Sequence, residues 1–172
     1  LQRQGAINVN MVTATHYAPQ VREAVRLARG MGLELPVVWN TSGYETVSAV
    51  AANKGTVDVY LTDFKYARAR TAADLSGAAD YPGVALAAID AMVEVAGPPT
   101  FDEFRGQTRM TGGVLVRHLM LPGREEESKE AVALLFERYG NHVMYSLMNQ
   151  YTPVLASRAA AGECWAATVL TR

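Results

Sequence analysis

The stretch VDVYLTDFKYA, Val57 to Ala67, reads as an apolar strand that ends in charged residues. Its first half is rich in β-branched and aromatic side chains, as expected for a strand of a parallel sheet that is covered on both faces. Asp63 and Lys65 follow at the strand's exit, and residues two apart in an extended chain point to the same side. The stretch therefore predicts a buried parallel strand that presents a carboxylate and an amine together at its carboxyl end.

The composition is that of one globular domain. The chain has 172 residues, of which 49% are hydrophobic and 19% charged, with a formal net charge of -1. A net charge this close to zero argues against nucleic-acid or membrane-surface partners, which usually need a basic patch. No apolar run is long enough to span a bilayer and no signal peptide is recognisable, so we expect a cytoplasmic protein. The single cysteine, Cys164, excludes an internal disulfide and any multi-thiolate metal site made by this chain alone.

Short runs of β-forming residues alternate with helical patterns along the chain, which predicts an α/β fold with a parallel sheet and right-handed crossovers. The predicted strands are Ile7–Thr13, Leu35–Thr41, Val57–Phe64, Gly113–Leu121 and His142–Tyr151. The predicted helices are one that begins near Pro19 and ends at Gly30, Tyr44–Asn53, Tyr81–Ala96 and Glu125–Tyr139. The segment between the third and fourth strands, Gly97 to Gly113, is expected to be an exposed excursion.

Polar side chains gather where the predicted strands end. In parallel α/β folds the ligand binds beyond the carboxyl ends of the strands, so these residues are candidates for one site. Ordinary polar loops are the alternative explanation. The candidate cofactor-binding residues are Asn8, Asn10, Thr13, Asn40, Thr41, Ser42, Asp63, Lys65, Arg117, Asn149 and Tyr151.

Arg117 lies in the middle of the apolar run VLVRHLML and needs an anion beside it. Desolvating an unpaired charge costs several kcal/mol, so Asp63 or a ligand carboxylate or phosphate is its expected partner. By strand alternation His118 points to the opposite face, and a structural role is the more common one for a lone strand histidine. Lys65 has two candidate roles: as a Schiff-base nucleophile, or as an anion-binding cation held charged by Asp63, and the adjacent acid favours the second.

Five motifs in order carry a specific resemblance: NVNMVTATHYAPQV, LPVVWNTSGYE, VDVYLTDFKYA, VLVRHLMLPG and SLMNQYTP. Together they resemble radical S-adenosylmethionine proteins related to the pyruvate formate-lyase-activating enzymes, over Gly5 to Val154 of a single domain. The tail from Leu155 to Arg172 has lost the pattern. The resemblance implies a partial (β/α) TIM-like barrel of about five parallel strands with outer helices. It also implies an iron–sulfur cluster that reductively cleaves S-adenosylmethionine to a hydrogen-abstracting radical.

The resemblance assigns roles residue by residue. Asn40 to Gly43 match the family's Asp-Thr-Asn-Gly turn near the ribose of the cofactor. TDFK matches its Asp-Leu-Lys, which places Asp63 and Lys65 among the charges that contact the cofactor. RHLMLPG matches its Arg-Tyr-Val-Val-Val-Pro-Gly, so Arg117 would also face S-adenosylmethionine. A zwitterionic sulfonium ligand explains why charges of both signs stand together.

The chain departs from the family at three places. Asn40 replaces an acid, and NQY replaces a Pro-x-His pattern at the end of the fifth motif. The CxxxCxxC cluster motif is also missing. The one cysteine, Cys164, cannot hold a 4Fe–4S cluster, which takes three or four thiolates. We therefore expect a C-terminal portion of such an enzyme that is inactive alone, with the cysteines upstream of Leu1. Its partner would be a glycyl-radical enzyme or another substrate.

Two other functions stay open from the sequence. One is a Schiff-base lyase or aldolase on a parallel barrel with Lys65 as its nucleophile. The other is a non-catalytic binding module on a degenerate barrel, whose exposed edge would drive homo-oligomer formation.

Overall fold

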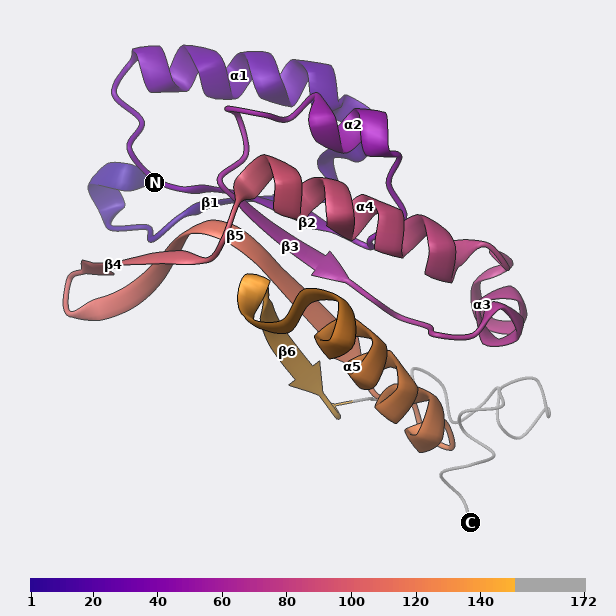
Figure 1. Ribbon diagram of the computed structural model, residues 1–172. Helices are drawn as coiled ribbons and strands as arrows, with labels where there is room; N and C mark the ends of the chain where they lie inside the picture. The colour runs from indigo at the N-terminus through magenta and orange to yellow at the C-terminus, as the bar shows by residue number, and fades with distance from the viewer. Residues whose placement is uncertain (151–172) are drawn as a thin grey trace, which may run out of the picture.

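The computed structural model describes residues 1–150 and shows a mixed α/β fold built on one six-stranded sheet (Figure 1). The strands are β1 (Val9–Val12), β2 (Val37–Thr41), β3 (Val59–Asp63), β4 (Thr100–Phe104), β5 (Gln107–Leu119) and β6 (Met144–Met148). The α-helices are α1 (Ala18–Gly30), α2 (Val47–Ala51), α3 (Ala69–Ser76), α4 (Tyr81–Ala96) and α5 (Glu125–Tyr139). Three 3₁₀ turns complete the described elements: η1 (Gln2–Gln4), η2 (Ala14–Tyr17) and η3 (Gly140–His142).

The sheet is mostly parallel, as the sequence predicts. Its order is β1-β2-β3-β5, with β6 on the far side of β5, and every neighbouring pair in this series is parallel. All five predicted strand segments therefore contain a strand of the parallel sheet. Within residues 1–150, β1 pairs only with β2 and β6 only with β5, so the described sheet is open and a closed barrel is not shown.

The segment between the third and fourth predicted strands is largely exposed, as expected, but most of it forms a β-hairpin that was not predicted. β4 pairs antiparallel with the first half of β5, which begins at Gln107 rather than near Gly113. Arg105 and Gly106 form the turn with φ values of 54° and 74°. Two successive left-handed residues match the right-handed twist of a two-residue hairpin, and this turn chemistry was the signal available in the sequence.

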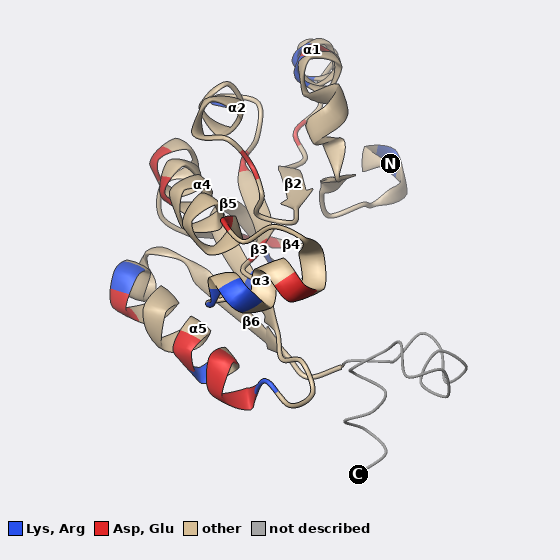
Figure 2. Ribbon diagram, turned by 90° about the vertical axis from the view of Figure 1, so that its right-hand side faces the viewer, with Lys and Arg blue, Asp and Glu red and all other residues tan. Residues whose placement is uncertain are grey.

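Four helices, α1, α2, α4 and α5, pack on one face of the sheet (Figure 2). Figure 2 shows α1, α2, α4 and α5 following one another around the same side of the strands. Large side chains on that face form the core, because alternate strand residues point toward the helices. The fully buried members include Trp39, Tyr60, Phe64, Ile89 and Met92.

The opposite face of the sheet has no helix over it in the part of the chain that the structure describes. Val12 is 67% exposed there, and Leu61 and Leu115 are half-buried. The parallel registers place Asn40 and Arg117 on this same face, at the carboxyl-terminal end of their strands. Helix packing therefore leaves this face of the sheet uncovered within residues 1–150 (Figure 2).

The helices begin and end close to the predicted positions. α4 and α5 have the predicted bounds, and three glutamates in the first turn of α5 complement the positive end of its dipole. α2 is shorter than the predicted Tyr44–Asn53 and begins after Thr46, whose hydroxyl accepts a hydrogen bond from the Ala49 amide. α3 has no counterpart among the helices predicted from the sequence. None of the helices within residues 1–150 has the length and apolarity that a bilayer crossing needs.

Candidate functional site

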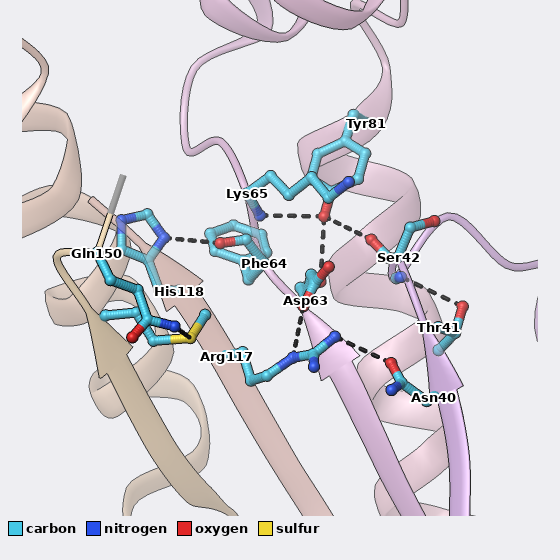
Figure 3. A network of polar contacts seen from close by, with 12 residues as sticks. Asn40, Thr41, Ser42, Asp63, Phe64, Lys65, Tyr81, Arg117, His118 and Gln150 are labelled. Atoms are coloured by element: carbon cyan, nitrogen blue, oxygen red, sulfur yellow. Dashed lines mark hydrogen bonds and ion pairs between the residues drawn. The ribbon is translucent and has the colours of Figure 1, made fainter. Parts of the chain in front are cut away.

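Three predicted site residues meet at the carboxyl ends of β2, β3 and β5 (Figure 3). The Nε of Arg117 donates to Oδ1 of Asp63 at 2.8 Å, and its Nη2 donates to Oδ1 of Asn40 at 2.9 Å. Asp63 and Arg117 are direct register partners on neighbouring strands. One guanidinium thus joins side chains from three adjacent strands on the uncovered face.

Partial burial makes this pairing necessary. The Arg117 and Asp63 side chains are 26% and 23% exposed, so each charge has lost most of its water. A guanidinium in that position needs an anion, and Asp63 supplies it. The prediction that Asp63 is the internal partner of Arg117 is confirmed.

Lys65 is arranged differently from the expectation. Its side chain is exposed, and its ammonium group forms no ion pair with any residue that the structure describes, because Asp63 is already paired with Arg117. Only the Lys65 backbone is fixed, by its amide, which donates to the Tyr81 hydroxyl at 3.0 Å. The site therefore holds one neutralised cation and one cation that is open to an anionic ligand.

These charged groups line a cavity of about 350 Å³. A volume of this size is at the small end of the range of small-molecule sites. Its walls combine the charged head groups with apolar side chains from β5, its exit loop and β6. The lining residues are Asp63, Lys65, Tyr66, Arg117, Leu119, Leu121 and Met148.

The exits of β2 and β3 are joined at Tyr81, the first residue of α4. Its hydroxyl lies 2.8 Å from the Ser42 carbonyl oxygen and 3.0 Å from the Asp63 carbonyl oxygen, either of which accepts its proton. Burial raises the pKa of Tyr81, so this hydroxyl stays protonated at physiological pH. Sequence reasoning placed Tyr81 at a helix start and gave it no further role.

Thr41 lies apart from the Arg117 cluster, on the helix-covered face of β2. Its hydroxyl is buried and donates to Oε1 of Glu45 at 2.7 Å. Thr15, in η2 after β1, donates to the same carboxylate oxygen at 2.5 Å. This buried Glu45 was not among the predicted residues, and it ties the exits of β1 and β2 together behind the site.

The remaining predicted residues are dispersed. Asn8 precedes β1 and Asn10 lies within it, toward the end of the sheet away from Arg117. Thr13 is closer, because its amide donates to the Asn40 carbonyl at 2.9 Å. Asn149 is exposed just after β6 and lines a separate groove beside α5. Ser42 has an exposed side chain, and Tyr151 lies outside the described residues.

His118 has the structural role expected of it. Its ring is 4% exposed on the helix-covered face, with Nδ1 2.7 Å from the Phe64 carbonyl oxygen and Nε2 3.0 Å from the Ser128 hydroxyl. Because a carbonyl only accepts, Nδ1 carries a proton and donates to Phe64, and Nε2 is paired with the Ser128 hydroxyl. Alternation along β5 thus separates Arg117 and His118, as predicted.

Comparison with known proteins gives one distant relative. The chain is 26% identical over 154 residues to an uncharacterised protein of Methanocaldococcus jannaschii. The aligned region covers 88% of this chain and 40% of that protein, so the chain spans less than half of the relative's length. No family model matches the sequence. No solved structure matches it either.

Proposed function

We propose that this chain is the S-adenosylmethionine-binding part of a radical S-adenosylmethionine enzyme of the pyruvate formate-lyase-activating type. The observation that carries the proposal is the convergence of Asn40, Asp63 and Arg117 beside Lys65 at one end of the uncovered sheet face. These residues belong to three of the five motifs on which the resemblance to that class depends. In this proposal the open sheet is a partial (β/α) barrel, and its helix-free face is the barrel interior.

The donor set suits a zwitterionic sulfonium nucleoside. The unpaired ammonium of Lys65 complements a carboxylate, and Oδ2 of Asp63 accepts no hydrogen bond from the residues described, so it is available to an ammonium group. Asn40 keeps its amide nitrogen available to a ribose hydroxyl, since only its Oδ1 is used by Arg117. When bound to such enzymes, S-adenosylmethionine supplies the radical that abstracts hydrogen from the substrate.

The residues of this chain do not fit a 4Fe–4S cluster. Such a cluster takes three or four thiolates, and the sequence has only Cys164, which lies outside the described residues. Among residues 1–150 there is also no group of three or more potential metal-ligating side chains. We therefore propose that ligands from outside these 172 residues hold the cluster, and that this chain binds the cofactor without cleaving it.

The proposed partner is the protein that carries the substrate hydrogen, a glycyl-radical enzyme or another substrate. The uncovered sheet face is the proposed approach to the site, because exposed apolar residues such as Val12 border it. Self-association is the competing use of the exposed sheet, through the edges of β1 and β6 that have no partner strand among residues 1–150. Gel filtration over a range of concentrations separates the two, since self-association makes the apparent mass rise with concentration.

Calorimetric titration of the full chain with S-adenosylmethionine tests the proposal. Arg117→Met should weaken binding by about 10- to 100-fold, the range expected for a hydrogen bond to a charged group. Arg109→Met is the matched control, because Arg109 is also ion-paired, with Asp102 at 2.7 Å, but lies on the β4–β5 hairpin away from the site. Equal affinities of the two variants, or no binding by the unsubstituted chain, would contradict the proposal.

Iron and sulfide reconstitution tests the cluster assignment. The chain alone should take up no four-iron cluster and release no 5′-deoxyadenosine from S-adenosylmethionine under reducing conditions. Addition of a segment that carries CxxxCxxC should restore both. Cluster uptake and cofactor cleavage by the isolated chain would show that its own residues suffice.

A Schiff-base enzyme is the second candidate, and the absence of an ion-pair partner for Lys65 among residues 1–150 favours it. The sequence predicts that Asp63 holds this amine charged, whereas Asp63 pairs with Arg117 instead. Against this role, the Lys65 side chain is exposed to solvent, whereas nucleophilic lysines are activated by desolvation. Borohydride reduction in the presence of aldehydes or ketones should leave Lys65 unlabelled if the first proposal holds.

A further inference from the structure

We infer that Tyr81 is a positioning residue of the ligand site, which holds the exit of β2 at a fixed distance from the exit of β3. This inference rests on the proposed function. The Tyr81 hydroxyl contacts the backbone of Ser42, Asp63 and Lys65 at 2.8, 3.0 and 3.0 Å, and all three are candidate site residues (Figure 3). Tyr81 itself is 3% exposed and does not line the cavity.

The hydroxyl acts both as a donor and as an acceptor. A phenol has one proton to donate and lone pairs that accept. The Lys65 amide occupies the acceptor side, and the two carbonyls share the donated proton. One atom therefore connects the turn after Asn40 to the segment that carries both Asp63 and Lys65.

The ring of Tyr81 is held from several sides. It is stacked on Tyr44 with a centroid distance of 6.0 Å and packs edge-on against Tyr66 at 5.4 Å. Phe64 packs at a tilt of 35°. Because the ring is fixed by contacts that do not involve its oxygen, replacement by phenylalanine should remove the hydroxyl and leave the packing in place.

Gly43 allows this close approach of the two exits. It has a φ of 82°, in the left-handed region that favours glycine. A Cβ at this position would lie inside van der Waals contact of the Asp63 carbonyl oxygen and 3.3 Å from the Tyr81 hydroxyl. The backbones of the two exits thus touch at the point where Tyr81 joins them.

A fixed distance between the exits matters only for a ligand that spans both. In the proposed site the ribose lies at the turn after β2, and the amino-acid portion lies near Asp63 and Lys65. A ligand that binds to one exit alone gains nothing from their connection, whereas one that bridges them avoids the cost of ordering the two loops. S-adenosylmethionine should therefore depend on Tyr81, and adenosine should not.

The test compares Tyr81→Phe with the unsubstituted full chain. Calorimetry should show about tenfold weaker binding of S-adenosylmethionine, the loss expected for one buried hydrogen bond. Adenosine affinity, measured by ligand-observed NMR, should not change. Amide hydrogen exchange at Lys65 should accelerate by about tenfold. Exchange at Phe64, whose amide donates to the Arg117 carbonyl at 2.9 Å, should stay protected.

Tyr139→Phe is the matched control. Tyr139 is 6% exposed, and its hydroxyl donates to Asp90 Oδ1 at 2.9 Å, away from the site. The Tyr139→Phe variant should have lower stability, with unchanged affinity for S-adenosylmethionine and unchanged amide exchange at Lys65. Equal effects of the two variants, or equal losses for adenosine and S-adenosylmethionine, would overturn the inference. If the unsubstituted chain binds no S-adenosylmethionine, the proposed function fails. Unchanged amide exchange at Lys65 in Tyr81→Phe would separately refute the connection that Tyr81 makes between the exits of β2 and β3.

Discussion

Substitution of Gly43 by alanine should lower stability more than the same substitution at another glycine with a positive φ, Gly77. Gly43 and Gly77 both have positive φ, at 82° and 66°. A Cβ at Gly77, which caps the end of α3, would meet nothing within 4 Å. A Cβ at Gly43 would meet the Asp63 carbonyl oxygen well inside contact distance, with Thr62 Oγ1 at 3.2 Å. Comparison of Gly43→Ala with Gly77→Ala therefore separates the cost of backbone strain from the cost of steric overlap.

The expected magnitudes follow from these two contributions. An L-residue in the left-handed region costs about 1–2 kcal/mol, and this applies to both glycines. Extra volume in a packed region costs about 1–3 kcal/mol more, and this applies only at Gly43. Gly77→Ala should thus lower the free energy of unfolding by about 1–2 kcal/mol, and Gly43→Ala by about 2–5 kcal/mol.

Urea denaturation of both variants measures the stability difference, and titration with S-adenosylmethionine measures its effect on the site. Gly43→Ala should abolish measurable binding under conditions where it remains folded, because the exits of β2 and β3 must separate to admit the methyl group. Gly77→Ala should bind as the unsubstituted chain does. Equal losses of stability and unchanged affinity in both variants would refute the close approach of the two exits.

Three further predictions concern charged side chains. In a double-mutant cycle of Arg117→Met and Asp63→Asn, urea denaturation should give a coupling free energy of about 1–2 kcal/mol. This value lies between those for exposed and buried ion pairs, because both side chains are partly exposed. Zero coupling would mean that the ion pair does not form. Lys65→Ala should change the free energy of unfolding by less than about 0.5 kcal/mol, because the ammonium group has no partner among residues 1–150. The same substitution should still weaken S-adenosylmethionine binding. A large loss of stability would reveal a partner. Hydrogen bonding to Arg138 lowers the pKa of Asp90, so this carboxylate stabilises the fold above its unfolded pKa and the benefit disappears as pH falls through the folded value. Asp90→Asn should therefore be less stable at pH 7, by under about 1 kcal/mol because the pair is partly exposed, and the difference should vanish in acid; a difference that grows in acid would contradict the assigned shift.

Local sequence patterns were sufficient for the strands and for the direction of their side chains. Runs such as LPVVW and VDVYL have the apolar character of covered parallel strands, and each contains an observed strand. Alternation alone placed Arg117 and His118 on opposite faces, and the contacts of both residues agree. Alternation is a property of the extended backbone, so it needs no knowledge of neighbouring strands.

Only the tertiary structure decided which groups meet. Asp63 and Arg117 are 54 residues apart, and they become partners because β5, rather than β4, pairs with β3 in that register. With Asp63 paired in this way, Lys65, the cation nearest to Asp63 in sequence, has no ion pair among residues 1–150. Tyr81 joins the ends of β2 and β3 through its hydroxyl, and no sequence spacing predicts this contact. A short pattern records the propensity and direction of each residue, whereas ion pairs and shared hydrogen bonds depend on strand order and register, which are fixed by the packing of the whole sheet.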